Sequence, residues 1–281
     1  MQPLSHYHTL YISPHLDDVA FSCAGSLLLE EQKPLSITIF SDAEPQNKKE
    51  TFRQRQHEES IAASRGNYDF LFAGFHDLRR TKKVNYFGLI WGEMEEHLIT
   101  AVYEYLKKII EQTQAKKVIA PLGVGRHVDH RICYEAICKL HVNFPKHDIW
   151  FYEDRPYSFP PQSTEVRLAE LGYLVDVDYE MYLKNLFNVR YLSNAKNIEK
   201  RLARCREHVD KVSHTTANKK IRETQYIVHH DLPSIWNIVS SYASQIKFFI
   251  GSEQEFATEC QNVATRYEQN VPYVERRWKL F

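Results

Sequence analysis

The chain has 281 residues, of which 43% are hydrophobic and 26% charged, and its 36 basic and 36 acidic side chains give a formal net charge of zero. These values are typical of a soluble globular protein and exclude a disordered chain, a collagen-like chain or a small disulfide scaffold. A neutral chain also lacks the basic surface of a nucleic-acid binder, so we expect no nucleic-acid partner.

Neither a membrane span nor a disulfide framework is predicted. No apolar run approaches the roughly 18 residues that a membrane helix needs. The first residues lack both the basic start and the apolar stretch of a signal peptide, so we expect a cytoplasmic protein. The five cysteines are scattered without a C-x-x-C pair, which favours reduced thiols over disulfides or a cysteine zinc site: Cys23, Cys133, Cys138, Cys205 and Cys260.

Residues 1 to 155 alternate strand-like and helix-like patterns, as successive βα units do. Short β-prone runs predict strands at 9–12, 35–40, 70–72, 117–120 and 149–152. Apolar residues at three- and four-residue spacing predict helices at 18–31, 51–64, 95–113 and 129–141. This alternation predicts an α/β fold with a Rossmann-like, mainly parallel sheet covered by helices on both faces. Ligands bind such sheets at the carboxyl ends of the strands.

The pattern changes beyond Pro160-Pro161. Helical spacing predominates there, with few clear strands, and helices are predicted near 195–212, 234–250 and 253–268. No linker, low-complexity tract or internal repeat separates this half from the first. We therefore expect one domain over 1–281, with a core at about 8–160 and a helical C-terminal extension at about 161–281.

Two short segments place metal-type ligands in the loops that directly follow predicted strands: SPHLDD at 13–18 and GRHVDH at 125–130. Each segment alone has an ordinary structural explanation. Asp17 or Asp18 can cap a helix, and the two histidines of the second segment can be surface residues at the start of a helix. Their joint placement after separate strands favours a shared site of two imidazoles and one carboxylate, which suits catalytic Zn²⁺ or Fe²⁺.

These segments resemble the motifs of the LmbE-like or PIG-L-like N-acetylglucosamine deacetylases, metal-dependent enzymes on a Rossmann-like sheet. That family's first motif reads (Ala/Ser)-Pro-His-Pro-Asp-Asp-Glu and its second His-x-Asp-His. This chain has SPHLDDV at 13–19 and HVDH at 127–130 in the same order, with Leu16 for the proline and Val19 for the glutamate. The resemblance covers roughly 8 to 160, and a fainter echo lies in Tyr242-x-Ser244-Gln245.

The resemblance implies a role for each polar residue of the two motifs. His15, Asp18 and His130 look like the ligands of a divalent metal, Zn²⁺ or alternatively Fe²⁺ or another cation. Asp17 resembles the general base, and His127 the general acid or oxyanion partner. Asp129 looks like the carboxylate that orients His127. Weaker echoes, in Arg55-x-x-Glu58, after the third strand and in Tyr152-Glu153-Asp154-x-Pro156-Tyr157, assign substrate binding to Arg55, Asp77 and Tyr157.

The chemistry of amide hydrolysis supports these roles independently. A Lewis-acid metal can lower the pKa of its bound water toward about 7 and polarise the acyl carbonyl. Asp17 could accept the proton of that water. A protonated His127 could then stabilise the oxyanion and donate a proton to the departing amine.

We therefore expect a metal-dependent hydrolase that removes the acetyl group from an N-acetylated amino sugar of the N-acetylglucosamine type, in a small molecule or a glycoconjugate. One alternative is an amidase for another N-acylated natural product, which would share every metal residue. Another is a catalytically silent carbohydrate-binding protein, which would need neither Asp17 nor His127. A dinucleotide site at 123–128 is not favoured, because the third glycine position of its fingerprint is Val128.

Overall fold

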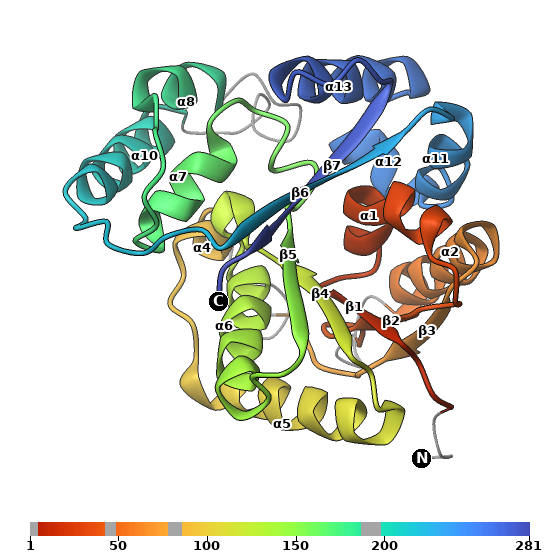
Figure 1. The fold of residues 1–281 in the computed structure, drawn as a ribbon. Coiled ribbons are helices and arrows are strands. Elements are labelled where there is room, and N and C mark those ends of the chain that lie inside the picture. Colours follow the sequence, from red (N-terminus) through yellow and green to blue (C-terminus); the bar gives the residue numbers. More distant parts are fainter. Residues whose placement is uncertain (1–4, 43–48, 78–85, 187–197) are drawn as a thin grey trace.

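One mixed sheet forms the centre of the computed structural model, which describes residues 5–42, 49–77, 86–186 and 198–281 (Figure 1). Among these described residues, seven strands follow the order β3-β2-β1-β4-β5-β7-β6. The five strands from the first half are parallel: β1 (Thr9–Ser13), β2 (Leu35–Thr38), β3 (Asp69–Phe72), β4 (Lys117–Pro121) and β5 (Asp148–Tyr152). The predicted Rossmann-like, mainly parallel sheet is therefore confirmed.

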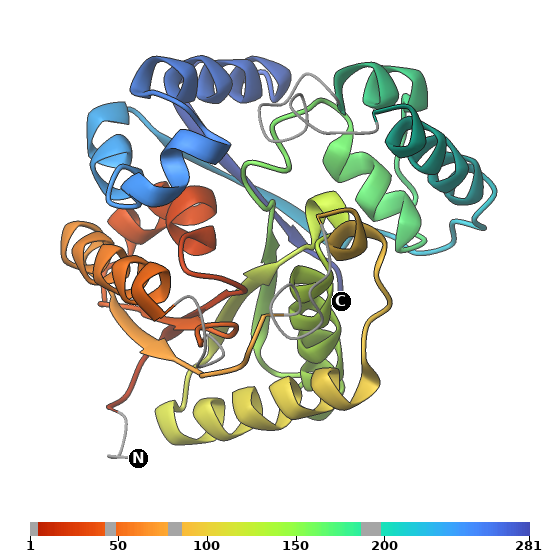
Figure 2. The same cartoon turned by 180° about the vertical axis from the view of Figure 1, so that it is seen from behind.

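Helices cover both faces of this sheet (Figures 1 and 2). One face packs against α5 (Glu96–Thr113) and α6 (Val128–Asn143) through a core that includes Leu10, Leu106 and Ile137. The other face packs against helices from both halves of the chain: α1 (Asp18–Leu29), α2 (Lys49–Gly66), α11 (Leu232–Val239) and α13 (Glu253–Arg266). Because both faces are covered, the central strands are buried and consist largely of apolar residues.

The predicted helices of the first half are confirmed, with ends that differ by a few residues. The helix predicted at 129–141 spans Val128–Asn143, and the one predicted at 95–113 spans Glu96–Thr113. The short helix α4 (Tyr86–Trp91) was not predicted. None of the helices among the described residues is long and apolar enough to cross a membrane.

The C-terminal half contributes strands as well as helices. Its helices are α7 (Ser163–Glu170), α8 (Tyr179–Leu186), α10 (Ile198–Ser213) and α12 (Ala243–Phe249), in addition to α11 and α13. The helix predicted at 234–250 is two helices, α11 and α12, and the first residues of the one predicted at 195–212 lie outside the described residues. The two strands, β6 (Glu223–His229) and β7 (Tyr273–Lys279), were not predicted; they are antiparallel to each other, and β7 is antiparallel to β5.

Buried charges join β7 to the parallel half of the sheet. Arg276 Nε donates to Glu153 Oε1 at 2.5 Å, and Trp278 Nε1 donates to the same oxygen at 3.0 Å. Glu275 Oε1 accepts from the backbone N–H of Gly25 at 2.7 Å. Because these charges are paired across the sheet, a strand with a highly charged sequence can be buried. The last strand therefore holds the end of β5 and the C-terminal half of α1 in place.

Candidate metal centre

A tight loop after β1 presents His15 at the carboxyl end of the sheet. Ser13 Oγ donates to the carbonyl oxygen of His15 at 2.6 Å and accepts from the backbone N–H of Val19 at 3.2 Å. Asp18 Oδ2 accepts from the backbone N–H of His15 at 2.7 Å. Leu16, the residue in place of the family's proline, is fully buried in the core between the sheet and α1. Val19, in place of the family's glutamate, is also buried, so both replacements in the motif are core residues of this loop.

Asp17 and Asp18 do not cap α1 with their side chains. Asp17 holds the N-cap position with φ 120° and makes no side-chain capping bond, while the Asp18 carboxylate accepts from the His15 backbone instead. A positive φ is uncommon for a residue other than glycine and is seen where the surroundings force it. The helix-cap explanation for this segment is therefore wrong, and the loop instead places both carboxylates at the end of β1.

The second loop, after β4, is shaped by two glycines. Gly123 and Gly125 have φ values of 80° and 78°. A Cβ atom on Gly125 would lie 2.6 Å from Cβ of Tyr157, so only glycine fits beside that tyrosine. The loop leads into α6, where His127 takes the N-cap position and His130 lies in the first turn. Both histidines are buried rather than at the surface.

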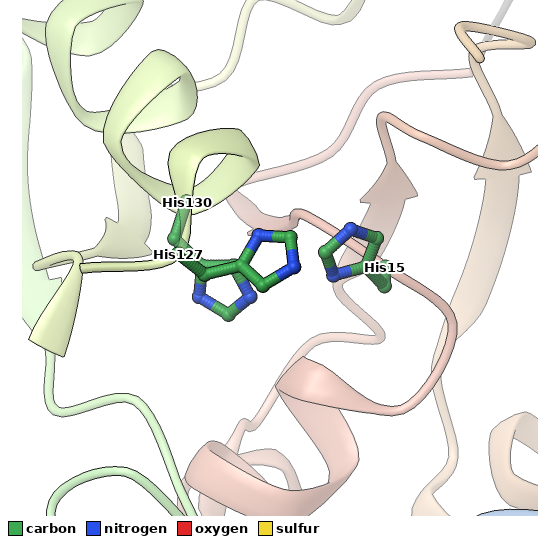
Figure 3. A group of neighbouring side chains, drawn as sticks. All are labelled: His15, His127 and His130. Carbon is green, nitrogen blue, oxygen red and sulfur yellow. The ribbon is translucent and has the colours of Figure 1, made fainter. Parts of the chain in front are cut away.

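The two loops meet because β1 and β4 are neighbours in the sheet. Figure 3 shows the rings of His15, His127 and His130 gathered together, and their ligand atoms lie within 4.8 Å of one another. Asp18 Oδ2 lies 3.4 Å from His15 Nδ1 and 3.4 Å from His130 Nε2. One carboxylate oxygen therefore faces a nitrogen of each of two imidazoles.

This arrangement fits a divalent cation. Ligand atoms about 2.0–2.1 Å from a tetrahedral cation lie roughly 3.3–3.4 Å from each other, as the Asp18 oxygen and the two nitrogens do. His130 Nε2 is buried and has no hydrogen-bond partner among the described residues. The opposite ring nitrogens are held by carboxylates: His15 Nε2 by Asp129 at 2.9 Å and His130 Nδ1 by Asp154 at 2.6 Å. Metal-binding histidines in proteins are held in this way.

His127 differs from the other two histidines in its hydrogen bonding. Its Nδ1 accepts from the backbone N–H of Asp129 at 3.3 Å. A neutral ring whose Nδ1 accepts carries its proton on Nε2, and a protonated nitrogen cannot bind a metal. This contact favours a proton-donating rather than a metal-binding role for His127.

The carboxylates and imidazoles of the cluster shift each other's pKa values. Burial opposes a charge on His15, but the hydrogen bonds with Asp129 and Asp18 outweigh burial and raise the pKa of its imidazole to about 10. Burial by itself would raise the pKa of Asp18, and the facing imidazoles of His130 and His15 lower it overall. Burial raises the pKa of Asp17 to about 7, against the opposing effect of the Arg55 guanidinium.

Protons should therefore compete with a divalent cation for this site. At pH 7 His15, with a pKa of about 10, carries a proton that an incoming cation must displace. The apparent affinity for Zn²⁺ should rise with pH, by about tenfold per pH unit for each proton released. Titration calorimetry in buffers of different ionisation enthalpy measures that release. Binding without proton release, and with the same affinity at pH about 6 and about 8, would contradict a site built on His15.

The remaining predicted residues also lie near this cluster, with contacts that differ in part from the prediction. Arg55 Nη2 lies 3.1 Å from Asp17 Oδ2 and also donates to the Leu16 carbonyl. Within the described structure Arg55 thus contacts the predicted base, whereas the sequence assigned it to the substrate. The Tyr157 ring meets the His130 ring edge-on, with centroids 5.5 Å apart. Burial raises the pKa of Asp129, and Asp77, which is buried after β3, adds to that rise through its nearby charge.

Asp129 contacts a different histidine from the one expected. Its Oδ2 lies 2.9 Å from His15 Nε2 and 3.9 Å from His127 Nδ1, so the carboxylate holds His15 more closely. Only its backbone N–H hydrogen-bonds to His127. The reason is geometric: Asp129 lies in the first turn of α6, and its side chain reaches across to the loop after β1.

The two segments with a weaker family resemblance, Arg55-x-x-Glu58 and Tyr242-x-Ser244, contact each other in the structure. Ser244 donates to Glu58 through its backbone N–H at 2.9 Å and its hydroxyl at 2.6 Å. The Tyr242 hydroxyl donates to Glu59 at 2.5 Å. The C-terminal extension thereby holds α2, the helix that carries Arg55, against the sheet.

Sequence reasoning named no role for Asp154, which the structure places at the cluster. It follows β5, is fully buried, and binds His130. Its position in the sequence could have indicated a role. Like the acidic residues of the two motifs, Asp154 lies just after a buried strand, within the Tyr152-Glu153-Asp154 segment.

Comparison with known proteins agrees with the fold and with the motifs. Residues 10–141 match the family model described as PIG-L, GlcNAc-PI de-N-acetylase. A curated relative, the 2'-N-acetylparomamine deacetylase of Streptomyces fradiae, is 30% identical over 170 residues, which are 56% of this chain and 60% of that protein. The A40926 pseudoaglycone deacetylase superposes with a TM-score of 0.63 at 15% identity, covering 97% of this chain and 96% of that one. The zinc-inhibited form of teicoplanin deacetylase superposes with a TM-score of 0.66 at 16% sequence identity, covering 96% of each chain. The family resemblance is confirmed.

Proposed function

Residues 10–141 match the PIG-L family model, and from this match we propose that the chain is a metal-dependent N-deacetylase for an N-acetylated amino sugar of the N-acetylglucosamine type. The substrate is a small molecule or a glycoconjugate that bears this sugar. The observation that carries the proposal is the placement of Asp18 Oδ2 at 3.4 Å from a nitrogen of both His15 and His130. A relative that deacetylates N-acetylparomamine supports the choice of an amino sugar.

We propose that His15, Asp18 and His130 hold the cation, and that it is Zn²⁺, with Fe²⁺ or another divalent ion as the alternative. Two imidazoles and a carboxylate form a typical three-ligand catalytic site with an open position. The cation supplies Lewis acidity, which polarises an acyl carbonyl and makes water more acidic. Because one solved relative is described as zinc-inhibited, the ion is best identified by testing several metals in parallel.

The protein groups would move the protons of the reaction. Asp17, held by Arg55 at 3.1 Å, accepts a proton from the attacking water as the water oxygen bonds to the acyl carbon. His127 stabilises the resulting oxyanion and donates a proton to the amine nitrogen as the C–N bond breaks. The products are a free amine and acetic acid, which loses its proton to solvent to become acetate, and Asp17 returns its proton to His127, so atoms and charges balance. Asp129 contributes by holding His15 through its carboxylate and His127 through its backbone N–H.

The sugar would bind beside the metal centre. We propose that Tyr157 and Asp77 contact it, and that Arg55 does so in addition to holding Asp17. Tyr157 supports this role because its ring already borders His130, and aromatic faces suit sugar rings. Asp77 supports it because a carboxylate can accept hydrogen bonds from sugar hydroxyls.

We also propose that the core at about 8–160 and the extension at about 161–281 form one domain. Two observations support this unit. The strand β7 extends the same sheet by pairing with β5. The helices α11 and α13 share one apolar core with α1 and α2.

The proposal predicts that the metal-loaded protein releases acetate and free amine in equal amounts from at least one N-acetylated amino sugar conjugate. A chelator should abolish the release, and the added metal should restore it. A panel should pair each amino sugar conjugate with an N-acylated natural product that lacks the sugar. Hydrolysis of only the sugar-free compounds would favour the other amidase, and sugar binding without hydrolysis would favour a silent binding protein.

A further inference from the structure

We propose that Asp154 is a positioning residue that sets the tautomer of His130, so that Nε2 of this histidine is the nitrogen free to bind the cation. The inference rests on the proposed metal-dependent function and adds to it a residue that neither motif contains. Asp154 acts through His130 and has no contact of its own with the reacting atoms.

Asp154 is the point at which three parts of the site are joined. It lies two residues after the end of β5, and none of its surface is exposed. Its Oδ1 lies 2.6 Å from His130 Nδ1. Its Oδ2 accepts from the backbone N–H groups of Gly123 and Val124, at 2.8 Å and 2.9 Å. One carboxylate thus binds α6 and the loop that leads to it from β4.

The hydrogen bonds leave His130 one arrangement for metal binding. An ionised carboxylate can only accept, so the nitrogen that faces it, Nδ1, must donate its proton. A neutral His130 therefore has its lone pair on Nε2. That atom faces Asp18 Oδ2 at 3.4 Å, and it is buried without a hydrogen-bond partner among the described residues. A carboxylate that fixes the ring in this way also strengthens the ligand.

Asparagine at position 154 should reverse this tautomer while keeping the shape of the site. The two backbone N–H groups of Gly123 and Val124 need an acceptor, so the amide oxygen must face them and the NH₂ group must face His130 Nδ1. Nδ1 would then have to accept, which places the proton of a neutral ring on Nε2. A protonated Nε2 cannot bind a cation. The hydrogen bonds from Gly123 and Val124 to the side chain at position 154 remain, so the substitution alters only the contact with His130.

The test compares Asp154→Asn with wild type and with a matched variant, Asp148→Asn. Asp148 lies at the other end of the same strand, where it accepts from Trp150 Nε1 at 2.9 Å. Zn²⁺ affinity is measured on metal-free protein by competition with a chromophoric chelator. We expect Asp154→Asn to bind Zn²⁺ about 10- to 100-fold more weakly. Asp148→Asn should keep wild-type affinity, and the thermal midpoint of metal-free Asp154→Asn should stay close to that of wild type.

The ring nitrogens can also be observed directly, without any variant. In Zn²⁺-loaded wild type, ¹⁵N spectra of labelled histidine should show His130 protonated on Nδ1 and metal-bound through Nε2. Metal bound through Nδ1 would overturn the inference even if Asp154→Asn failed to fold, and so would Asp154→Asn binding Zn²⁺ within about twofold of wild type. A wild-type chain that binds no divalent cation would overturn the proposed function itself, which separates the two failures.

Discussion

Replacing His130 with alanine should remove most of the bound divalent cation, and with it any deacetylase activity. The imidazole is fully buried and supplies one of the three proposed ligands, and alanine offers no ligand atom in its place. The change also leaves the carboxylate of Asp154 without its 2.6 Å contact to the ring. Losing the partner of a buried polar group costs about 1–3 kcal/mol, so the variant should also be less stable. Elemental analysis of the purified variant measures the metal, and acetate release measures the activity.

His141→Ala is the matched control for this variant. His141 lies on the same helix, near its end, and its ring stacks on Phe281 with centroids 4.2 Å apart. Its removal should leave metal content and activity unchanged. Circular dichroism of both variants checks that α6 still forms. Full metal occupancy in folded His130→Ala would show that His130 is not a ligand and would require another ligand set, such as one that includes His127.

The parallel half of the fold could be predicted because its signals are local. A strand buried on both faces needs an apolar run, and a helix packed on the sheet needs apolar residues every three or four positions. Both patterns can be read within a window of a dozen residues, as in Val102, Leu106 and Ile109 of α5. Helix ends were less certain, because the chain can leave a helix at several adjacent residues at similar cost.

The strands β6 and β7 could not be predicted, because distant partners stabilise them. The β7 sequence YVERRWK has a charged centre that resembles an exposed segment, yet it is buried. Glu275 binds α1 at the backbone N–H of Gly25, and Arg276 binds Glu153, and neither partner is close in sequence. The edge strand β6 alternates exposed and half-buried residues, which is a weak pattern in isolation.

In the candidate site, too, contacts between residues that are distant in sequence could not be predicted. Residue types and their position after strands were enough to bring His15, Asp18 and His130 into one cluster. They were not enough to say which carboxylate holds which ring, because the orientation of a side chain depends on the packing of two loops. Asp129 therefore turned out to hold His15, and Asp154, in the loop after a third strand, turned out to hold His130.

Replacing Asp17 with asparagine should separate catalysis from metal binding. Asp17 lies beside two proposed ligands without being one, and asparagine keeps its shape and is, like aspartate, among the non-glycine residues most often found at positive φ. What is lost is a carboxylate that can accept the proton of the attacking water. General-base catalysis contributes about 10² to 10⁴ in rate, so kcat should fall by roughly that factor, with little change in metal content or substrate affinity.

Asp69→Asn is the control for the loss of a paired carboxylate as such. Asp69 forms an ion pair with Lys33 at 2.6 Å, far from the metal cluster in the described fold, and its replacement should leave kcat unchanged.

The alternative role for Asp17, that of a helix cap, already has no capping bond in its favour. Asparagine caps helices about as well as aspartate, so a mere cap would keep its activity on this substitution. Asp17→Asn enzyme that binds its metal normally and deacetylates at close to the wild-type rate would therefore rule out Asp17 as the base, whichever acetylated sugar is the substrate.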